Sequence, residues 1–509
     1  MSALEQKVNS GQISDVSLQI SEQMPGAFAA LARKHQVPGA QFAIYHGGST
    51  IAHEIGELEF GTGLRVNRDT VFPIGSVTKF FTATVAMILV ADGDVDLDAP
   101  IRDYVPEMGD LGTTISLRQL LSHTSGLAES SGMEEKSSSS LRHYIVEHVC
   151  GRNLVQPPGT GFSYSNPGYI VAGRLIETVT GMSWSEAVES ILLRPLGIEP
   201  AFVNPPGTIP PPRRVATGHS VNTAVDRIRP VQQELPPAFA PASALAVSAV
   251  DLVKLGLIHV RPGRPEVLPV AYAKQMRRAV PHADPFGLAD GWGAGLAVYR
   301  QCSGEWVGHD GNVSGASCYV RINPADGWVV ALTSNSNTGI GLWRDFQAEL
   351  ARVGVPINPP RTPAPGGPRT AAPRTAAPHG CVGQYTNGDI QCTVKADSDG
   401  AVYLSADGEK FVRVNLHEDF TFSVPDLASL GQASTGRFVR DPATGRIYGI
   451  HVNGRLVRRR QRGGQRLAPK AAAVDAGYLF TRNYTSASLT GRTGWHGGQG
   501  RQPSPDVRV

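Results

Sequence analysis

The chain has 509 residues, of which 41% are hydrophobic and 18% are charged, and its formal net charge is +3. This length is enough for two or three domains that each bury a core of their own. The near-balance of charge argues against a nucleic-acid partner, because such proteins usually carry a concentrated basic surface.

The N-terminal residues mix acids, amides and serines, without the basic start and apolar stretch of a secretory signal. No run of about 18 apolar residues predicts a membrane span. The five cysteines are odd in number and fit neither a zinc site nor a dense disulfide framework. We therefore expect a cytoplasmic protein with reduced thiols that binds neither nucleic acid nor a membrane.

Residues 1–24 are expected to form an N-terminal lead, and residues 25–355 the first domain. In residues 39–59 two strand patterns flank a Gly-Gly turn. Helical patterns follow at 81–93, 116–127, 168–181 and 247–260, and short apolar runs split by glycines or turns follow at 292–300, 305–311, 316–323 and 327–335. Helices grouped between strand pairs predict an α+β fold with an antiparallel sheet, not a regular βαβ series.

Composition divides the rest of the chain into three parts. Residues 356–380 are rich in proline and contain the pentapeptide RTAAP twice in tandem, which predicts a semi-rigid linker. Residues 381–462 hold short strand patterns with glycine-containing turns, which indicate a small all-β sheet or barrel. Residues 463–509 are rich in Gly, Arg, Ser and Thr without periodicity, and we expect a disordered tail.

The first chemical motif is G-S-V-T-K, in which Ser76 and Lys79 lie three residues apart at the start of an apolar helix. Alone, this spacing also fits a helix cap followed by a solvent-exposed lysine. On a helix, however, residues i and i+3 share a face, so Lys79 can reach Ser76. A desolvated lysine has a lowered pKa and can accept the proton of the serine.

Two further motifs follow in the same domain. Tyr164 and Asn166 belong to Y-S-N in a Gly/Pro-rich loop, which fits either a surface turn or a proton shuttle beside a substrate-binding amide. His309 and Gly311 belong to H-D-G between strand-like segments. That motif fits either a hairpin turn or a strand edge where glycine lets a substrate approach the backbone.

In this order and spacing, the three motifs resemble those of the serine β-lactamase and penicillin-binding-protein family. The Y-S-N and H-D-G variants are similar to the class C β-lactamase, esterase and D-aminopeptidase branch. Other stretches agree with it: LLSHTSGL at 120–127, YSNPGYIVAGRLIE at 164–177 and RPLGIEP at 194–200. The resemblance covers residues 25–350 and implies a β-lactamase/transpeptidase-like catalytic domain.

The resemblance also implies roles for the motif residues. Ser76 would be the acylated nucleophile, Lys79 and Tyr164 would share the general-base and general-acid work, and Asn166 would position the substrate. His309 stands where many relatives have lysine, and it would orient the substrate carboxylate or tune Tyr164. The backbone N–H groups of Ser76 and of Asn312, just after Gly311, would form the oxyanion hole. No metal or cofactor is needed. His123 is interpreted as a structural helix-end residue.

The C-terminal unit resembles the lipocalin-like domains attached to D-aminopeptidases and to penicillin-binding-protein-type peptide cyclases. It would cover the mouth of the active site or act as a spacer. The basic stretch at 455–466 is interpreted as a solvated strand end that runs into the tail, with contact to an acidic partner as the alternative.

These features predict a serine acyl-enzyme catalyst that acts on a small peptide or ester, delivered free or by a carrier protein. We favour a biosynthetic acyltransferase or nonribosomal peptide cyclase, with a D-aminopeptidase or esterase as the alternative. A β-lactamase or DD-carboxypeptidase is disfavoured because His309 replaces the carboxylate-binding lysine. A non-catalytic binding protein that keeps the fold is the remaining alternative.

Overall fold

The computed structural model describes residues 3–130, 140–203, 213–233, 235–301, 303–357, 377–408, 410–424 and 434–460; for 3–15 and 434 it describes the backbone alone. The linker expected at 356–380 falls mostly outside these residues, and the tail expected at 463–509 falls wholly outside them. The described helices are α1 (Ala3–Lys34), α2 (Thr78–Asp92), α3 (Leu117–Leu121), α4 (Leu141–Tyr144), α5 (Asn166–Thr180), α6 (Trp184–Ala187), α7 (Ala240–Ser243), α8 (Ala249–Gly256), α9 (Val270–Arg277) and α10 (Gly339–Arg352).

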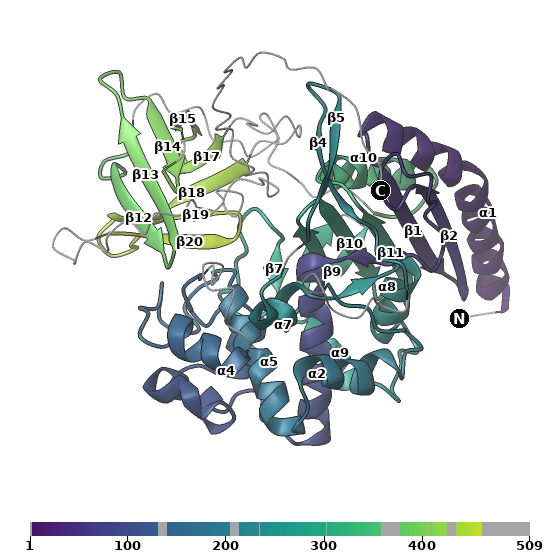
Figure 1. The fold of residues 1–509 in the computed structure, drawn as a ribbon, viewed down its shortest axis with the longest axis horizontal. Coiled ribbons are helices and arrows are strands. Elements are labelled where there is room, and N and C mark those ends of the chain that lie inside the picture. Colours follow the sequence, from purple (N-terminus) through teal and green to yellow (C-terminus); the bar gives the residue numbers. More distant parts are fainter. Residues whose placement is uncertain are drawn as a thin grey trace, which may run out of the picture.

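An antiparallel sheet of seven described strands forms the centre of the first domain (Figure 1). Its order is β2 (Ser49–Gly56), β1 (Gly39–His46), β11 (Trp328–Ser334), β10 (Ala316–Asn323), β9 (Gly304–Val313), β8 (Ala297–Gln301) and β7 (Gly291–Trp292). Two strand pairs lie outside it, β3 (Phe72–Pro73) with β6 (Ala246–Val247), and β4 (Gly218–Asn222) with β5 (Arg227–Val231). The predicted α+β class and antiparallel sheet are therefore confirmed.

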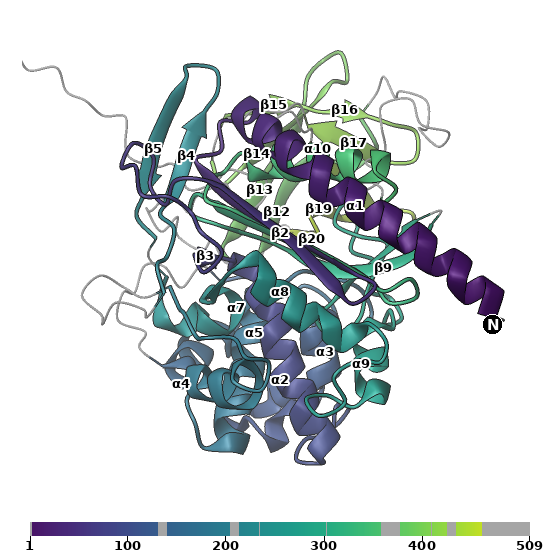
Figure 2. The same ribbon diagram turned by 90° about the vertical axis from the view of Figure 1, so that its right-hand side faces the viewer.

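Both faces of this sheet are buried, because helices cover each of them (Figures 1 and 2). Strand β11 shows the pattern: Val330 and Leu332 pack towards α1 and α10, whereas Val329 and Ala331 pack towards the helical layer that contains α2, α5 and α8. This alternation follows from the two-residue period of a strand. The catalytic motifs lie where the second layer meets the sheet.

The lead expected at residues 1–24 is the first part of α1, which runs unbroken through Pro25. Ile20, Met24 and Phe28 are four residues apart, share one helical face and are buried in the same cluster as the sheet. The boundary expected at residue 24 therefore falls inside a helix. Most residues around its apolar stripe are polar, so the sequence gives little sign of that stripe.

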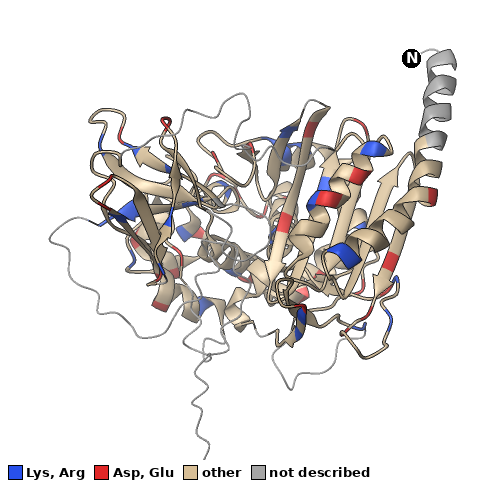
Figure 3. Ribbon diagram, turned by 90° about the horizontal axis from the view of Figure 1, so that it is seen from above, with Lys and Arg blue, Asp and Glu red and all other residues tan. Residues whose placement is uncertain are grey.

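Nine strands in the described part of the C-terminal domain form one antiparallel sheet. Their order is β15 (Val412–Arg413), β14 (Val402–Ala406), β13 (Ile390–Ala396), β12 (Gly383–Asn387), β20 (Arg455–Arg459), β19 (Ile447–Val452), β18 (Ser434–Arg440), β17 (Thr421–Val424) and β16 (Asn415–Leu416). The two edge strands, β15 and β16, are separated by Val414 alone, so the sheet curls into a nearly closed barrel around its own apolar core. Basic and acidic residues are interspersed over both domains (Figure 3).

Turns of the barrel contact backbone groups of the first domain. The carbonyl of Gly454 accepts a hydrogen bond from the N–H of Tyr164 at 2.8 Å. The side-chain oxygen of Asn387 accepts one from the N–H of Glu129 at 2.8 Å, and the next residue, Gly388, lies so close that a Cβ there would be 1.7 Å from the carbonyl oxygen of Glu129. The barrel is therefore docked by specific contacts beside the Y-S-N motif.

The Gly388 contact gives a test of this docking. Gly388→Ala is expected to lower the melting temperature of the whole chain by several degrees, because the backbone of Glu129 must move. Gly445→Ala is the matched control: it has a similar positive φ (67° against 58°) in a turn of the same barrel, but an added Cβ there meets nothing within 4 Å. Its cost is backbone strain alone, about 1 kcal/mol. Equal losses in calorimetry would show that the contact contributes nothing.

Candidate active site

The turn that carries Ser76 is pressed against strand β9. Ser76 lies in a single 3₁₀ turn, Gly75–Val77, directly before α2. Gly75 has φ = +50°, and a Cβ on it would lie 2.6 Å from the carbonyl oxygen of Asn312. A Cβ on Gly311 would lie 1.9 Å from the carbonyl oxygen of Ile74. The two glycines let the backbones meet, and this brings the backbone of Asn312 next to the nucleophile turn, as the predicted oxyanion hole requires.

Lys79 is fully buried on the first turn of α2, whose other residues are mostly apolar. Its Nζ donates to Ser76 Oγ at 3.2 Å, to Asn166 Oδ1 at 2.8 Å and to the carbonyl of Ala242 at 3.1 Å. Burial lowers the pKa of Lys79 from 10.5 to about 7, with a smaller raising effect from Glu129. At neutral pH a large share of Lys79 is therefore uncharged and able to accept a proton from Ser76.

Tyr164 also contacts Ser76. Its hydroxyl is hydrogen-bonded to Ser76, yet burial raises its pKa well above 10. The phenol is therefore protonated at neutral pH and is suited to donate a proton rather than to accept one. Lys79 Nζ lies 5.1 Å from the centre of its ring, and the ring of His123 stacks on it at 4.2 Å. Of the two residues predicted to share the proton transfers, these protonation states favour Lys79 as the base and Tyr164 as the acid.

Asn166 is the first residue of α5, and the side chain of Ser165 caps that helix by accepting from the N–H of Gly168. The orientation of the Asn166 side-chain amide follows from its neighbours, because its oxygen accepts the hydrogen bond from Lys79 Nζ. The amide nitrogen donates to Glu129 Oε1 at 3.1 Å. Asn166 thus links the base to a buried carboxylate that none of the sequence motifs includes.

His309 lies inside β9, so the H-D-G motif is not a hairpin turn. Strand β8 pairs with β9 only as far as Gly308, and the half of β9 that holds His309 and Gly311 is an open edge beside the nucleophile turn. The Nδ1–H of His309 donates to the carbonyl of Asp310 at 2.7 Å, and Nε2 has no partner among the described residues. Burial lowers the pKa of His309 to about 3. The imidazole is neutral at pH 7 and does not replace the positive charge of a lysine.

Two residues of the site were missed from the sequence, and a third has more contacts than were predicted. His123 follows the end of α3, as expected of a helix-end residue, and it also stacks on Tyr164 and accepts from the N–H of Ser165 at 3.1 Å. Glu129 gives no motif signal. Arg455 is buried, with its Cζ 5.0 Å from the centre of the Tyr164 ring, and it forms an ion pair with Glu129 at 3.3 Å. The interpretation of the basic stretch as a solvated strand end is therefore wrong for Arg455, although Arg458 in the same strand is exposed.

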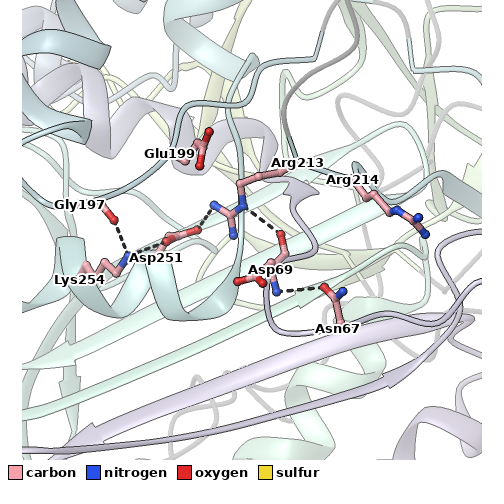
Figure 4. Close-up of a pocket in the computed structure, with 8 residues that line it drawn as sticks. All are labelled: Asn67, Asp69, Gly197, Glu199, Arg213, Arg214, Asp251 and Lys254. Atoms are coloured by element: carbon pink, nitrogen blue, oxygen red, sulfur yellow. Dashed lines mark hydrogen bonds and ion pairs between the residues drawn. The ribbon is translucent and has the colours of Figure 1, made fainter.

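Within the described residues no cluster of three or more His, Cys, Asp or Glu could hold a metal ion. A polar pocket lies elsewhere in the domain, and three of its charged side chains are paired with one another (Figure 4). Arg213 and Lys254 both contact Asp251, at 2.6 and 3.2 Å, and Lys254 also donates to the carbonyl of Gly197. This pocket contains none of the catalytic candidates.

Among the described residues, one segment is long and apolar enough to cross a membrane, Gly75–Asp92. It consists of the nucleophile turn and α2, and 78% of it is buried inside the protein. It is the core helix of the catalytic domain, and its apolar character is what keeps Lys79 away from water.

Comparison with known proteins points to one family. The profile of the beta-lactamase family matches residues 24–350. Penicillin-binding protein 4 of Amycolatopsis lactamdurans is 34% identical over 355 residues, which are 66% of this chain and 93% of that protein. The crystal structure of SurE is 38% identical with a TM-score of 0.78, and the match covers 87% of this chain and 100% of that chain.

Two solved structures of similar proteins contain a D-amino acid. SurE was also solved with D-Leu, and that structure is 36% identical with a TM-score of 0.74, over 89% of this chain and 100% of that chain. D-amino acid amidase from Ochrobactrum anthropi SV3, complexed with D-phenylalanine, is 26% identical with a TM-score of 0.54. That match covers 61% of this chain and 91% of the amidase.

The assignment of the nucleophile and base is tested by acyl labelling. Ser76→Ala is expected to take up no label from a fluorophosphonate or penicillin probe, as measured by intact-protein mass spectrometry. Lys79→Met keeps the apolar stem and should lower the labelling rate by roughly 10²–10⁴-fold. Near-normal labelling of Lys79→Met would remove lysine from the mechanism, and circular dichroism checks that both variants fold.

The pH dependence follows from the pKa of about 7 for Lys79. Below that pH the lysine is protonated and cannot accept the Ser76 proton; above it the neutral form dominates. The acylation rate is therefore expected to rise with pH through about 7. One pH unit below the midpoint it should be about tenfold lower than its plateau at high pH. A rate that does not change with pH across this range would contradict a lysine base.

Proposed function

We propose acyl transfer to an amine as the activity of this chain, which belongs to the beta-lactamase family of serine hydrolases and acyltransferases. The acyl donor is a peptide ester or thioester that ends in a D-residue, free or presented by a carrier protein. The acceptor is an amine, and in a nonribosomal peptide cyclase it is the amino group at the other end of the same peptide.

One observation carries this proposal: the likeness to SurE extends over both domains, and SurE was solved with D-Leu. The match to SurE covers 87% of this chain, whereas the match to the D-amino acid amidase covers 61% of it. The D-amino acids bound in both structures support a preference for D-residues.

The geometry supports the acylation half-reaction as follows. Ser76 Oγ attacks the carbonyl carbon of the donor, and neutral Lys79 takes the hydroxyl proton. The negative charge that forms on the carbonyl oxygen faces the backbone N–H groups of Ser76 and Asn312. The bond to the leaving group then breaks, and the protonated phenol of Tyr164 is placed to donate the proton that the leaving group needs.

In the second half-reaction an amine replaces water as the nucleophile. The proton that Lys79 gained first passes to the Tyr164 phenolate, which makes Lys79 neutral again. Lys79 then takes a proton from the amine as the amine attacks the Ser76 ester, and Tyr164 donates its proton to Ser76 Oγ as the ester bond breaks. Transfer of the proton from Lys79 to Tyr164 restores the starting state. The burial of Lys79, Tyr164 and His309 supports this choice, because water has little access to the base. Only Ser76 among these groups is partly exposed.

The alternative is hydrolysis of the same acyl-enzyme, as in a D-amino acid amidase or esterase. The name of the Ochrobactrum relative favours it, and neutral Lys79 could also take a proton from a water molecule that reached the acyl-enzyme. A β-lactamase or DD-carboxypeptidase is less favoured, because neutral His309 does not supply a cation for the substrate carboxylate.

The two activities are separated by one assay. Peptide thioesters that end in D-Leu or L-Leu are incubated with the enzyme, with and without an amine acceptor, and the products are identified by mass spectrometry. We expect aminolysis or cyclisation of the D-substrate, with at least about tenfold less product from the L-substrate. Hydrolysis products alone, under every acceptor tried, would reject acyl transfer and leave the hydrolase alternative.

A further inference from the structure

Two buried charged groups lie beside the catalytic residues and have no part in the reaction just described. Glu129 and Arg455 are 4% and 7% exposed and form an ion pair at 3.3 Å between the catalytic domain and the barrel. Burying two charges costs several kcal/mol for each ion and is repaid only by close pairing. A pair that connects two domains at an active site therefore needs an explanation beyond stability.

The barrel fixes Glu129 through the turn between β12 and β13. The N–H of Glu129 donates to the side-chain oxygen of Asn387, and its carbonyl accepts from the N–H of Asp389 at 3.2 Å. Gly388 between them leaves no room for a side chain. Asp389 is itself paired with Arg152 of the catalytic domain at 2.7 Å. The loop that carries the carboxylate is thus held by the second domain.

The barrel places Arg455 through the turn between β19 and β20. Asn453 and Gly454 have φ values of 46° and 72°, which is the left-handed pair that an Asn-Gly hairpin turn prefers. Gly454 accepts the hydrogen bond from the N–H of Tyr164, so the turn is anchored on the catalytic motif itself. Arg455 follows directly and lies against the face of the Tyr164 ring.

We propose that Arg455 is a positioning residue for the acylation of Ser76. The positive charge of Arg455 offsets the negative charge of Glu129. The Glu129 carboxylate can then hold the Asn166 amide in its orientation without keeping Lys79 protonated as an ion-pair partner. The C-terminal barrel thus supplies a group on which the base depends. The inference rests on the Ser76 acylation of the proposed function and not on whether the acceptor is an amine or water.

The charges around Lys79 support this role. Six ionisable side chains from several elements interact with Lys79. Tyr169 belongs to α5, His309 to β9 and Arg455 to β20. Tyr164 and Glu129 lie in loops, and His123 follows α3. Burial raises the pKa of both tyrosines and lowers the pKa of both histidines, so these four are neutral at pH 7. Among these described groups, only Glu129 and Arg455 are charged, and they act on Lys79 with opposite signs.

The consequence has a definite direction. Without Arg455, the carboxylate of Glu129 faces Lys79 uncompensated and stabilises the protonated lysine. Without the charge of Glu129, Arg455 repels the protonated lysine instead. If both charges are removed together, the two effects cancel to a large extent.

The experiment measures acylation of the full chain by an uncharged N-acetyl-D-leucine ester from about pH 5 to about pH 9. Arg455→Met should move the midpoint of the acid limb up by about one pH unit or more, and Glu129→Gln should move it down. The double variant should return to within about half a unit of the wild-type midpoint. Arg455→Lys, which keeps the charge, should recover most of the shift.

Arg458→Met is the matched control, because Arg458 lies on the same strand but is exposed, and it should leave the midpoint unchanged. Should Arg455→Met fail to fold, the downward shift in Glu129→Gln remains required by the proposal.

Two results overturn the inference. One is an Arg455→Met enzyme with a raised KM and an unmoved acid limb, which would make the arginine a substrate-binding group. The other is a double variant whose midpoint stays displaced from the wild-type value by about one pH unit or more. A wild-type chain that forms no Ser76 ester with any donor is a different result, because it removes the proposed function as well.

Discussion

The burial of one lysine side chain is the constraint on which the rest of the active site depends. Lys79 stands on an apolar helix in the centre of the catalytic domain, where a permanent charge is costly. Its Nζ must therefore be surrounded by acceptors, and Ser76, Asn166 and the Ala242 carbonyl provide them. The same desolvation that makes the site costly is what gives the lysine a pKa near neutrality and makes it a base.

The protonation states of Tyr164 and His309 follow from the same burial. Burial raises the pKa of Tyr164 and lowers that of His309, so both remain neutral while Lys79 changes its charge. A neutral phenol can donate a proton and a neutral imidazole can accept a hydrogen bond, so neither group competes with Lys79 for the role of base. Glycines at 75 and 311 allow the backbones to approach closely enough for an oxyanion site.

The site is not completed by the catalytic domain alone. The barrel contributes two turns, one on the loop of Glu129 and one on the backbone of Tyr164, and through the second it inserts Arg455. The domain that the sequence suggested to be a cover or a spacer thus lies within contact distance of the chemistry. Its docking through backbone hydrogen bonds and a glycine without room for a side chain makes the relation of the two domains specific.

Sequence patterns predicted the elements that depend on local or periodic signals. The strands on either side of the Gly-Gly turn at 47–48 and the helices within 81–93 and 168–181 formed where expected. The boundary expected at residue 24 fell inside helix α1, because its three buried apolar residues, spaced four apart, give a weak pattern among polar neighbours. The H-D-G segment fitted a turn as well as a strand, because short glycine-containing runs do not distinguish them.

By itself, the sequence determined the order of the three motifs and predicted a nucleophile and its lysine, because each is a short pattern of residue types. Only the tertiary structure decided which groups surround them. Glu129 and Arg455 are 326 residues apart, and neither belongs to a motif. Their effect on Lys79 comes from burial and distance, and both arise only when the barrel docks on the catalytic domain.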